Sequence, residues 1–272
     1  MNPQKTALIT GGGSGIGKEI CKRFYKEGFE LVVISLDANE LNTLQNELSS
    51  LKISSPRPVH CLPLDLTDPN ATQKVAAFCD EIHCDIDILI NNAGFGLHDK
   101  HVDLNLDQVN SMLNLNILAV SSLCHLFANK MRLSKTATSK TIINIGSTSA
   151  FQPIPLLAAY AASKAFVVSF TEALSVELKE DGINVHCVCP GTTKTPFLDV
   201  AGLSDNATLG STAYIAHKIA MSPKDVANLA FNIVGSKHTT AVPGLVNKLH
   251  YQITHWLPSI IVQPVVNRIF NR

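Results

Sequence analysis

A tyrosine and a lysine lie one helical turn apart in the segment "AAYAASKAFVVSFTEAL", residues 158–174. At this i, i+4 spacing Tyr160 and Lys164 share one face of a predicted helix. A free phenol, with a pKa of about 10, is a poor base at neutral pH, and a nearby cation lowers that pKa. Ser147 ends a predicted strand and can donate a hydrogen bond to the same substrate oxygen. A phenol, an ammonium and a hydroxyl in this arrangement favour proton transfer at a carbonyl or alcohol oxygen. The alternative is that Tyr160 and Lys164 are an ordinary pair of side chains on the surface of a helix.

A glycine-rich turn, "TGGGSGIGKEI", follows the first predicted strand and contains Gly11, Gly15 and Gly17. Glycine permits positive φ and lets a ligand approach the backbone closely. A helix that begins at such a turn offers free N–H groups and a favourable dipole to a pyrophosphate. The turn lacks the G-K-[ST] ending of an ATP- or GTP-binding loop. The sequence therefore predicts a dinucleotide site.

The elements that must position these residues alternate between short apolar runs and helical patterns. Because the runs are apolar throughout, they predict a parallel sheet covered by helices on both faces, an α/β doubly wound fold. The strands are expected at 6–10, 30–35, 59–64, 87–90, 141–146, 184–189 and 239–243, and the helices at 16–27, 39–51, 70–82, 107–131, 157–180 and 223–235. We expect one catalytic domain over 1–243, with 191–222 as its substrate loop, and an apolar extension over 244–272.

The composition of the 272 residues excludes several functional classes. Lys and Arg together number 22, as do Asp and Glu, so no net field favours nucleic acid. Seven cysteines form no C-x-x-C pair and are expected to be reduced thiols of a cytoplasmic protein. The N-terminus leaves no room for a signal peptide before the first strand, and no apolar run is long enough to predict a membrane span.

The motifs, taken in order, resemble those of the compact, single-domain short-chain dehydrogenases/reductases. They are "TGGGSGIG" at 10–17, "LDL" at 64–66, "NNAG" at 91–94, Asn116 in "MLNLNILA", Ser147 in "INIGSTSA", "YAASK" at 160–164 and "PGTTKT" at 190–195. The resemblance implies a Rossmann-type sheet of about seven strands, a nicotinamide cofactor, and hydride transfer between that cofactor and an alcohol or carbonyl. It further implies that Tyr160, Lys164, Ser147 and Asn116 are catalytic.

The resemblance also implies a set of cofactor contacts. Lys164 would bind the nicotinamide ribose, and Asn116 would hold a water that links Lys164 to solvent. Asn91 and Gly94 would lie near the adenosine ribose, Asp65 and Leu66 at the adenine, and Thr193 and Thr195 at the carboxamide. The full set is Gly11, Ser14, Gly15, Ile16, Gly17, Ser35, Asp37, Asp65, Leu66, Asn91, Ala93, Gly94, Tyr160, Lys164, Pro190, Gly191, Thr193 and Thr195. The alternatives are structural: Gly94 and Thr195 as turn residues, and a helix cap in "DLTDPN", which Asp68 suits better than Asp65.

The choice between NAD and NADP is read at the end of the second strand, in "VVISLDANEL". Ser35 stands where NAD-binding relatives carry an acid, and Leu36 stands where NADP-binding relatives carry an arginine. Asp37 follows one residue later, and Ser14 replaces the basic residue common in the glycine turn of NADP-binding relatives. With an acid nearby and no cation to neutralise a 2′-phosphate, we expect NAD in preference to NADP.

Motifs for a metal site, a hydrolase or an epimerase are weaker in this sequence. His83 with Cys79 and Cys84, or His98 with His101, lack the paired spacing of a zinc site, so we expect no metal. The segment "IGSTSA" is not the G-x-S-x-G elbow of a hydrolase. The loop spacing also disfavours the extended epimerases and dehydratases of the family.

Substrate and partners are indicated only coarsely. The substrate loop is small and apolar, with Phe197, Leu198, Leu203, Leu209, Tyr214 and Ile215, and favours an uncharged, hydrophobic alcohol or ketone. Helices 107–131 and 157–180 form the subunit contact in many family members, which implies a homodimer or homotetramer. The extension 244–272 is expected to pack on the domain or a partner subunit, with peripheral membrane contact as the alternative. A dinucleotide-binding sensor or scaffold without catalysis is the competing function.

Overall fold

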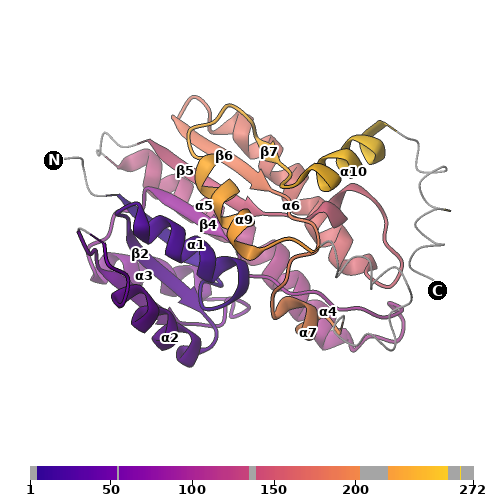
Figure 1. Ribbon diagram of the computed structural model, residues 1–272, viewed down its shortest axis with the longest axis horizontal. Helices are drawn as coiled ribbons and strands as arrows, with labels where there is room; N and C mark the ends of the chain where they lie inside the picture. The colour runs from indigo at the N-terminus through magenta and orange to yellow at the C-terminus, as the bar shows by residue number, and fades with distance from the viewer. Residues whose placement is uncertain (1–4, 54, 135–138, 203–219, 257–263, 265–272) are drawn as a thin grey trace.

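The computed structural model describes residues 5–53, 55–134, 139–202, 220–256 and 264. Its centre is a parallel seven-stranded sheet in the order β3-β2-β1-β4-β5-β6-β7 (Figure 1). The strands are β1 Thr6–Thr10, β2 Glu30–Ser35, β3 Val59–Pro63, β4 Ile88–Asn91, β5 Lys140–Ile145, β6 Ile183–Val188 and β7 Thr240–Ala241. The predicted doubly wound Rossmann-type fold is confirmed.

The strand order creates a crevice at one edge of the sheet. The chain builds outward from β1 to β2 and β3, then returns to the other side of β1 and continues through β4 to β7. The loops after β1 and β4 therefore leave these neighbouring strands in opposite directions. Open α/β sheets bind ligands at such a switch point, where the strand order reverses. The glycine turn follows β1, and "NNAG" begins at the end of β4.

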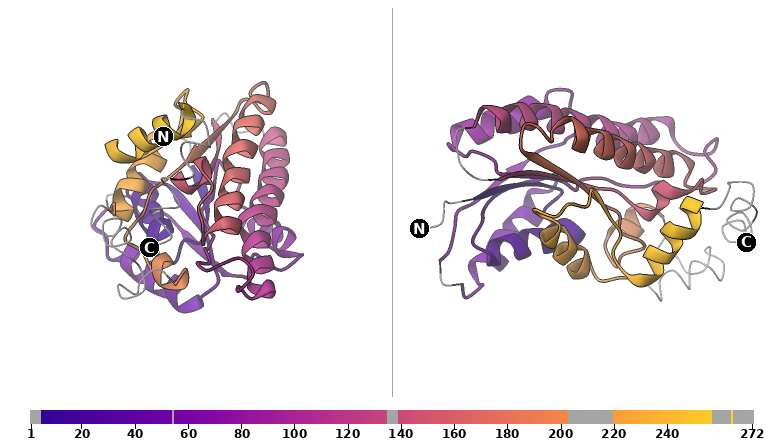
Figure 2. Two further views of the ribbon diagram at one scale, coloured as in Figure 1. Left: turned by 90° about the vertical axis from the view of Figure 1, so that its right-hand side faces the viewer. Right: turned by 90° about the horizontal axis from the view of Figure 1, so that it is seen from above.

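Helices cover both faces of the sheet (Figure 2). On one face, α1 Gly15–Lys26, α2 Ala38–Ser49 and α9 Pro223–Asn232 bury their apolar sides in one core cluster. On the other, α3 Ala71–Glu81, α5 Val120–Leu133 and α6 Ala158–Glu177 pack in a second cluster. Strands β1, β2 and β5 are buried along their whole length, which explains their uninterrupted apolar pattern.

The helix expected at 107–131 has a break in its middle. Helix α4, Leu106–Leu113, passes into a π-helical segment, η1 Asn114–Ala119, before α5 begins. The whole run Leu106–Leu133 has a mean hydropathy of 1.4 in its most apolar window. By length and composition alone, it could cross a membrane. In the fold, Leu123, Cys124 and Phe127 of this run belong to the core beneath the sheet. Core packing therefore accounts for part of its hydropathy, since 44% of that window is buried.

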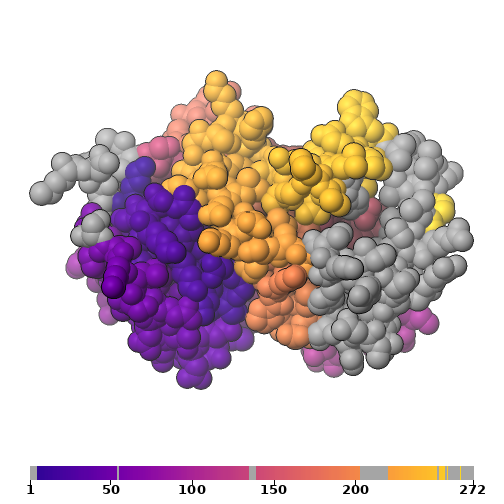
Figure 3. All heavy atoms as spheres, viewed as in Figure 1, coloured from indigo at the N-terminus to yellow at the C-terminus, as the bar shows by residue number. Residues whose placement is uncertain are grey.

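The C-terminal helix α10, Leu245–Trp256, lies over the carboxyl edge of the sheet and forms part of the surface in Figure 3. It packs on the short 3₁₀ helix η2, Thr148–Phe151, where the rings of Tyr251 and Phe151 have centroids 4.5 Å apart. A short helix, α7 Phe197–Val200, begins the predicted substrate loop. The predicted pocket residues Leu203, Leu209, Tyr214 and Ile215 lie outside the described residues.

Candidate active site

The glycine turn is built so closely that side chains would not fit. Gly11 and Gly15 have φ of +61° and +53°, and a Cβ on Gly17 would lie 2.0 Å from the carbonyl oxygen of Gly11. Ser14 is the N-cap of α1 but makes no side-chain capping bond. The first N–H groups of α1 are therefore left for another acceptor at the crevice. The predicted pyrophosphate contact of this turn stays a prediction, and Ile16 packs inward on the core.

"NNAG" is joined to this turn by Asn92, which our sequence analysis did not single out. Its Nδ2 donates to the carbonyl oxygens of Thr10 and Gly11, each at 3.0 Å. The Thr10 hydroxyl in turn accepts from the backbone N–H groups of Asn92 and Ala93. The repeated asparagine was the signal that could have found it. Asn92 therefore holds the loops after β1 and β4 together.

The Asn91 side chain is bound within the sheet, and the predicted position of this residue near the adenosine ribose stays a prediction. Its Nδ2 donates to Asn144 Oδ1 at 2.8 Å, and the side chain is buried beside Cys124 between β4 and β5. The strand alternation sends neighbouring side chains to opposite faces. Asn91 thus faces the α5 side of the sheet, and contact with a cofactor is left to its backbone.

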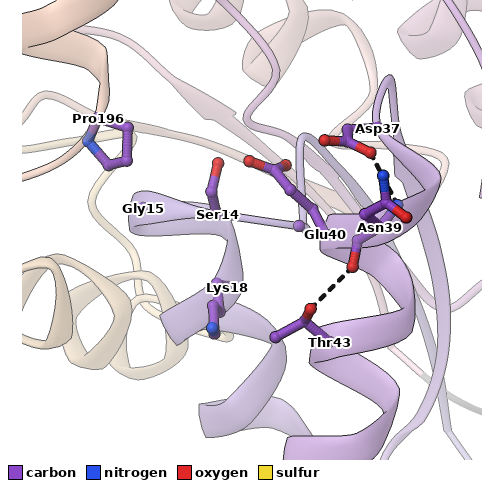
Figure 4. Close-up of a pocket in the computed structure, with 9 residues that line it drawn as sticks. Ser14, Gly15, Lys18, Asp37, Asn39, Glu40, Thr43 and Pro196 are labelled. Carbon is purple, nitrogen blue, oxygen red and sulfur yellow. Dashed lines mark hydrogen bonds between the residues drawn. The ribbon is translucent and has the colours of Figure 1, made fainter.

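A cavity of about 400 Å³ lies between the glycine turn and the start of α2 (Figure 4). Asp37 lines it, but its carboxylate caps α2 by accepting the Asn39 N–H at 2.7 Å. A second acid, Glu40, lies closer to the glycine turn. Its Oε2 is 3.3 Å from Ser35 Oγ, and a Cβ on Gly13 would lie 2.6 Å from it. Glu40 was missed because it follows the strand by five residues and reaches back from the first turn of α2. The cavity lining is Gly13, Ser14, Gly15, Lys18, Asp37, Asn39, Glu40, Thr43 and Pro196.

Asp65 supports the loop at the far end of this region. Its carboxylate accepts both the backbone N–H and the hydroxyl of Thr67, each at 2.8 Å. Leu66 next to it is buried in the core. Helix α3 begins at Ala71 with Asn70 as its N-cap, so neither Asp65 nor Asp68 caps it directly. The structure therefore gives the Asp65 carboxylate a turn-stabilising role, with the predicted adenine contact still a prediction.

The π-helical segment presents Asn116 to the crevice. Its Nδ2 donates to the carbonyl oxygen of Phe95 at 3.0 Å and to Ser163 Oγ at 3.1 Å, and its Oδ1 accepts the Phe95 N–H. A Cβ on Gly94 would lie 2.8 Å from Asn116 Oδ1 and 3.5 Å from Lys164 Nζ. Gly94 therefore marks the point where Asn116 and Lys164 converge, and π-helical turns are often found at such functional sites.

Tyr160 and Lys164 lie on α6 as predicted, both buried. The Lys164 ammonium donates to the carbonyl oxygen of Ile145 at 2.9 Å and lies 6.0 Å from the centre of the Tyr160 ring. Burial raises the pKa of Tyr160 to about 12, and a hydrogen bond with Ser147 opposes this rise. Burial lowers the pKa of Lys164 to about 8. The expected lowering of the phenol pKa by the lysine is therefore not produced by the protein groups alone.

Ser147 is held at the end of β5 by the 3₁₀ turn that follows it. Its hydroxyl lies 3.0 Å from Ser149 Oγ and accepts the Ser149 N–H at 3.1 Å. The thiols of Cys187 and Cys189 pack against Gly146, next to Ser147. The sequence predicted them only as reduced thiols. Cys187 Sγ and Cys189 Sγ are 3.5 Å apart, and both would lie 2.9 Å from a Cβ on Gly146. Gly146 thus lets the end of β5 approach β6 closely.

The segment after β6 meets the glycine turn and α10. Thr193 is buried and donates to the carbonyl oxygen of Gly191, downstream of Pro190. The Thr195 side chain lies 3.3 Å from the position of a Cβ on Gly15, so the "PGTTKT" segment meets the glycine turn. Asn247 of α10 covers Gly191, where an added Cβ would lie 2.5 Å from Asn247 Oδ1. Sequence reasoning had no signal for Asn247 because α10 lies beyond the matched motifs.

The residues that converge here fit a dinucleotide. Glycines at positions 11, 13, 15, 17, 94 and 191 let the surrounding segments approach one another more closely than side chains would allow, and helix α1 starts at this crevice. Acids line the cavity beside the glycine turn, and the buried phenol and ammonium of Tyr160 and Lys164 lie elsewhere in the crevice. The geometry therefore separates a nucleotide-binding part from a part suited to proton transfer.

Comparisons with known proteins agree with this division. The sequence profile described as short chain dehydrogenase matches residues 5–205. Sulfoacetaldehyde reductase 2 of Chromohalobacter salexigens is 32% identical over 241 residues, which make up 88% of this chain and 90% of that protein. "Probable oxidoreductase EphD" of Mycobacterium bovis is 31% identical over 195 residues, 71% of this chain. This chain spans about a third of the length of that relative, since the match covers 32% of it.

Solved structures show the same architecture. A short-chain dehydrogenase from Sphingobium yanoikuyae in complex with NADPH is similar with a TM-score of 0.75 and 29% identity, covering 93% of this chain and 96% of the other. A 3-ketoacyl-(acyl-carrier-protein) reductase from Brucella melitensis complexed with NADH has a TM-score of 0.75 and 26% identity, covering 88% and 96%. On the profile match, the relatives and the shared architecture, this chain belongs to the short-chain dehydrogenase family.

Proposed function

We propose that this protein is an NAD(P)-dependent oxidoreductase that acts on an uncharged, hydrophobic carbonyl or alcohol. The observation that carries the proposal is the buried Tyr160 phenol, hydrogen-bonded with Ser147 and one turn from Lys164, at the end of a crevice built for a dinucleotide. A protein that only binds the dinucleotide needs no buried phenol and ammonium at this position, because leaving such groups out of water is costly.

The chain's own groups support carbonyl reduction as the direction at neutral pH. With its pKa raised to about 12, the Tyr160 phenol is protonated and can donate that proton to the oxygen of a reduced carbonyl. The Ser147 hydroxyl, fixed by Ser149, can donate a hydrogen bond to the same oxygen. A bound nicotinamide would supply the hydride for the carbonyl carbon, so one hydride and one proton complete the alcohol. Alcohol oxidation instead requires the phenolate, whose formation the protein groups alone disfavour.

The surroundings of the phenol support a hydrophobic substrate. The Tyr160 ring belongs to an apolar cluster with Met112, Ile154 and Leu157. Phe197, at the start of the predicted substrate loop, has its ring centroid 5.5 Å from that of Tyr160. These apolar side chains favour a substrate with apolar groups next to the reacting carbonyl, because binding removes those groups from water.

Glu40 supports NAD as the preferred cofactor. Its carboxylate lies beside Gly13 and Ser35, at the end of the cavity where a family member holds the adenosine ribose. A carboxylate can accept hydrogen bonds from ribose hydroxyls, whereas a 2′-phosphate there would meet a like charge. Lys18 lines the same cavity, but it forms an ion pair with Glu47. The cation that could neutralise a phosphate is thereby already paired.

The experiment that tests the function combines a substrate panel with one variant. Purified protein is mixed with NADH or NADPH and a series of ketones and aldehydes, and cofactor oxidation is followed by absorbance. We expect turnover of hydrophobic carbonyls, and Tyr160→Phe should lower it by about 10²–10⁴, the usual contribution of positioned acid–base catalysis. The cofactor Kd should remain within a few-fold, since the ring itself is retained.

The same panel separates the enzyme from its alternative. A sensor or scaffold would bind NADH with no turnover of any carbonyl, and Tyr160→Phe would then change nothing measurable. Turnover that survives unchanged in Tyr160→Phe would contradict the assigned role of the phenol even if the protein is an enzyme.

The cysteines and helix α10 indicate the compartment and the partners of the protein. We propose a cytoplasmic homo-oligomer; all seven cysteines are free thiols, five of them fully buried, which supports a reducing compartment. Helix α10 packs one side on the domain, and the larger part of Leu245, Leu249 and Trp256 is exposed on its other side. Contact with a partner subunit or a membrane surface through this side remains a proposal.

A further inference from the structure

Three side chains from separate elements meet at the edge of the sheet opposite the crevice. Glu30 is the first residue of β2, His60 lies on β3, and Cys84 lies in the turn between α3 and β4. Glu30 Oε1 is 2.8 Å from His60 Nε2 and 3.3 Å from Cys84 Sγ. The imidazole nitrogen, thiol sulfur and carboxylate oxygen all lie within 4.8 Å of one another. None of the three belongs to the active site described above.

The backbone holds each of these residues in a defined place. The register of β2 and β3 pairs Leu31 with Val59 and Val32 with His60, which brings the imidazole next to the first residue of β2. Helix α3 ends with His83 in the left-handed region, at φ +54°, and the N–H of Cys84 donates to the carbonyl oxygen of Cys79. This is the hydrogen-bond pattern of a Schellman helix end, and it orients Cys84 independently of any ligand.

The spacing of the three atoms suits a tetrahedral zinc ion. Zinc binds imidazole nitrogen and carboxylate oxygen at about 2.0–2.2 Å and thiolate sulfur at about 2.3 Å. In a tetrahedron these bond lengths place neighbouring ligand atoms about 3.2–3.6 Å apart. The Glu30–His60 and Glu30–Cys84 separations, 2.8 and 3.3 Å, are shorter than these values by about 0.2–0.7 Å. The His60 nitrogen and the Cys84 sulfur lie within 4.8 Å of each other. Rotation of the partly exposed His60 and Cys84 side chains can adjust these separations.

The surroundings of the three atoms include a carboxylate that contacts both other groups. Glu30 Oε1 lies beside His60 Nε2 and beside Cys84 Sγ. A carboxylate in this position attracts a dication. Glu30 is almost fully buried, whereas His60 and Cys84 are partly exposed, so the cluster is open to solvent on one side. That opening leaves a fourth position for water.

We propose that Glu30, His60 and Cys84 form a zinc-binding site with one coordination position open to water. Thiolate, imidazole and carboxylate together match zinc, while the thiol excludes calcium and magnesium as preferred ions. On binding, the Cys84 sulfur loses its proton to solvent and forms the bond to the metal, with no change of oxidation state. The ion would tie the turn before β4 to β2 and β3. The site lies away from the crevice, so its effect is on stability and not on the hydride-transfer chemistry.

The test uses the full-length, reduced protein after treatment with a chelator. Zinc is titrated in competition with a chromophoric chelator, and cobalt is titrated separately to record its absorption spectrum. We expect one zinc per chain, a cobalt spectrum with a thiolate charge-transfer band, and a higher melting temperature with zinc. Cys84→Ser should abolish the charge-transfer band, and Cys84→Ser or His60→Gln should weaken zinc binding at least about tenfold.

Two matched variants control for other thiols and imidazoles. Cys61→Ser removes a thiol next to His60 in the chain, and His83→Asn removes an imidazole next to Cys84 while tolerating the left-handed backbone. Both should keep the full zinc affinity. NADH binding at the opposite edge reports that each variant is folded. The proposal fails if the unmodified protein binds no stoichiometric zinc, or if folded Cys84→Ser and His60→Gln bind it as tightly as before.

Discussion

The two acids that follow β2 perform separate tasks in the structure. Asp37 caps α2 through the N–H of Asn39, while the Glu40 carboxylate reaches back to Ser35 and Gly13. Removing the charge of Glu40 with Glu40→Gln should relieve repulsion of a 2′-phosphate. We expect the Kd for NADPH to fall about tenfold, equivalent to about 1.4 kcal/mol, with little change for NADH. Fluorescence titration with both cofactors measures this.

Asp37→Asn is the matched control for that experiment. Asparagine caps a helix about as well as aspartate, so α2 keeps its start while the other negative charge is removed. We expect a smaller change in the NADPH Kd than for Glu40→Gln. An equal or larger change in the control would assign the cofactor preference to Asp37 instead.

Lys164 makes stability depend on pH in a direction that can be calculated. Burial lowers its pKa from 10.5 to about 8 in the folded protein. Between these values the unfolded lysine binds more protons than the folded one, so the contribution of Lys164 to stability rises with pH through this window, and its penalty is complete below pH 8. That penalty is about 3.5 kcal/mol at ~1.4 kcal/mol per pKa unit. Buried thiols, whose pKa values burial raises, act in the opposite direction above pH 9, so the lysine is read from the difference between the unmodified protein and Lys164→Met. Lys164→Met should remove the rising contribution and stabilise the protein at neutral pH.

Denaturant unfolding at a series of pH values up to 10, below the raised pKa of Tyr160, measures this slope. Lys179→Met, which removes an exposed lysine beyond the end of α6, should leave the slope of the unmodified protein in place. If Lys164→Met retained that slope, the buried ammonium would not be its origin.

Candidate site residues could be named from the sequence, whereas the directions of their side chains could not. Ser147, Tyr160, Lys164 and Asn116 could be chosen because each is a chemically unusual group at a fixed spacing. Asn91 and Asn92 are the same residue type in one motif, and only the pleat of β4 decides that Asn92 faces the glycine turn. Sequence spacing carries no such information at the end of a strand.

The glycine turn is the element whose geometry is most constrained. A Cβ on Gly17 would lie 2.0 Å from the carbonyl oxygen of Gly11 and 2.5 Å from Asn92 Nδ2. Gly17→Ala must therefore push the turn and the α1 start apart. We expect a loss of about 1–3 kcal/mol of stability, typical of overpacking, and at least a tenfold weaker NADH Kd. Thermal unfolding and fluorescence titration measure the two effects.

Gly182→Asn is a control at a turn remote from the crevice. Gly182 has φ +71° with nothing within 4 Å of an added Cβ, and asparagine tolerates this conformation. We expect NADH binding to remain unchanged. A Gly17→Ala protein that binds NADH normally would show that the turn relaxes without cost to the cofactor.

Helices and strands were predictable to within a few residues wherever one periodic pattern continued. The exception is the run 107–131, predicted as one helix but interrupted by η1. A π-helical turn inserts residues without a polar or glycine break, so hydrophobic spacing alone does not reveal it. The interruption nevertheless decides where Asn116 points. α10 was also not predicted as an element, because its mixed polarity obscures its period and it lies beyond the matched motifs.

For the whole molecule, the doubly wound parallel sheet could be predicted from the alternation of strands and helices. The cluster of Glu30, His60 and Cys84 could not, since these residues are far apart in the chain and only the strand order brings them together. Cys84 was weighed for a metal only with His83 and Cys79, its neighbours in sequence. Metal ligands supplied by three separate elements leave no local spacing to detect.

The last prediction concerns the outer face of α5 and α6, which lie side by side at one surface of the molecule (Figure 2). Leu118 of η1, Leu133 of α5 and Val176 of α6 belong to this helical layer and are exposed to 58%, 82% and 72%. Exposed apolar side chains of this kind are typical of a subunit interface. We expect light scattering after size exclusion to give the mass of two or four chains. The double variant Leu118→Glu with Val176→Glu should raise the dissociation constant at least about tenfold. Val102→Glu, at an equally exposed site in the loop before α4, should leave the mass unchanged; a monomeric unmodified protein, or an unaltered double variant, would exclude this face as the contact.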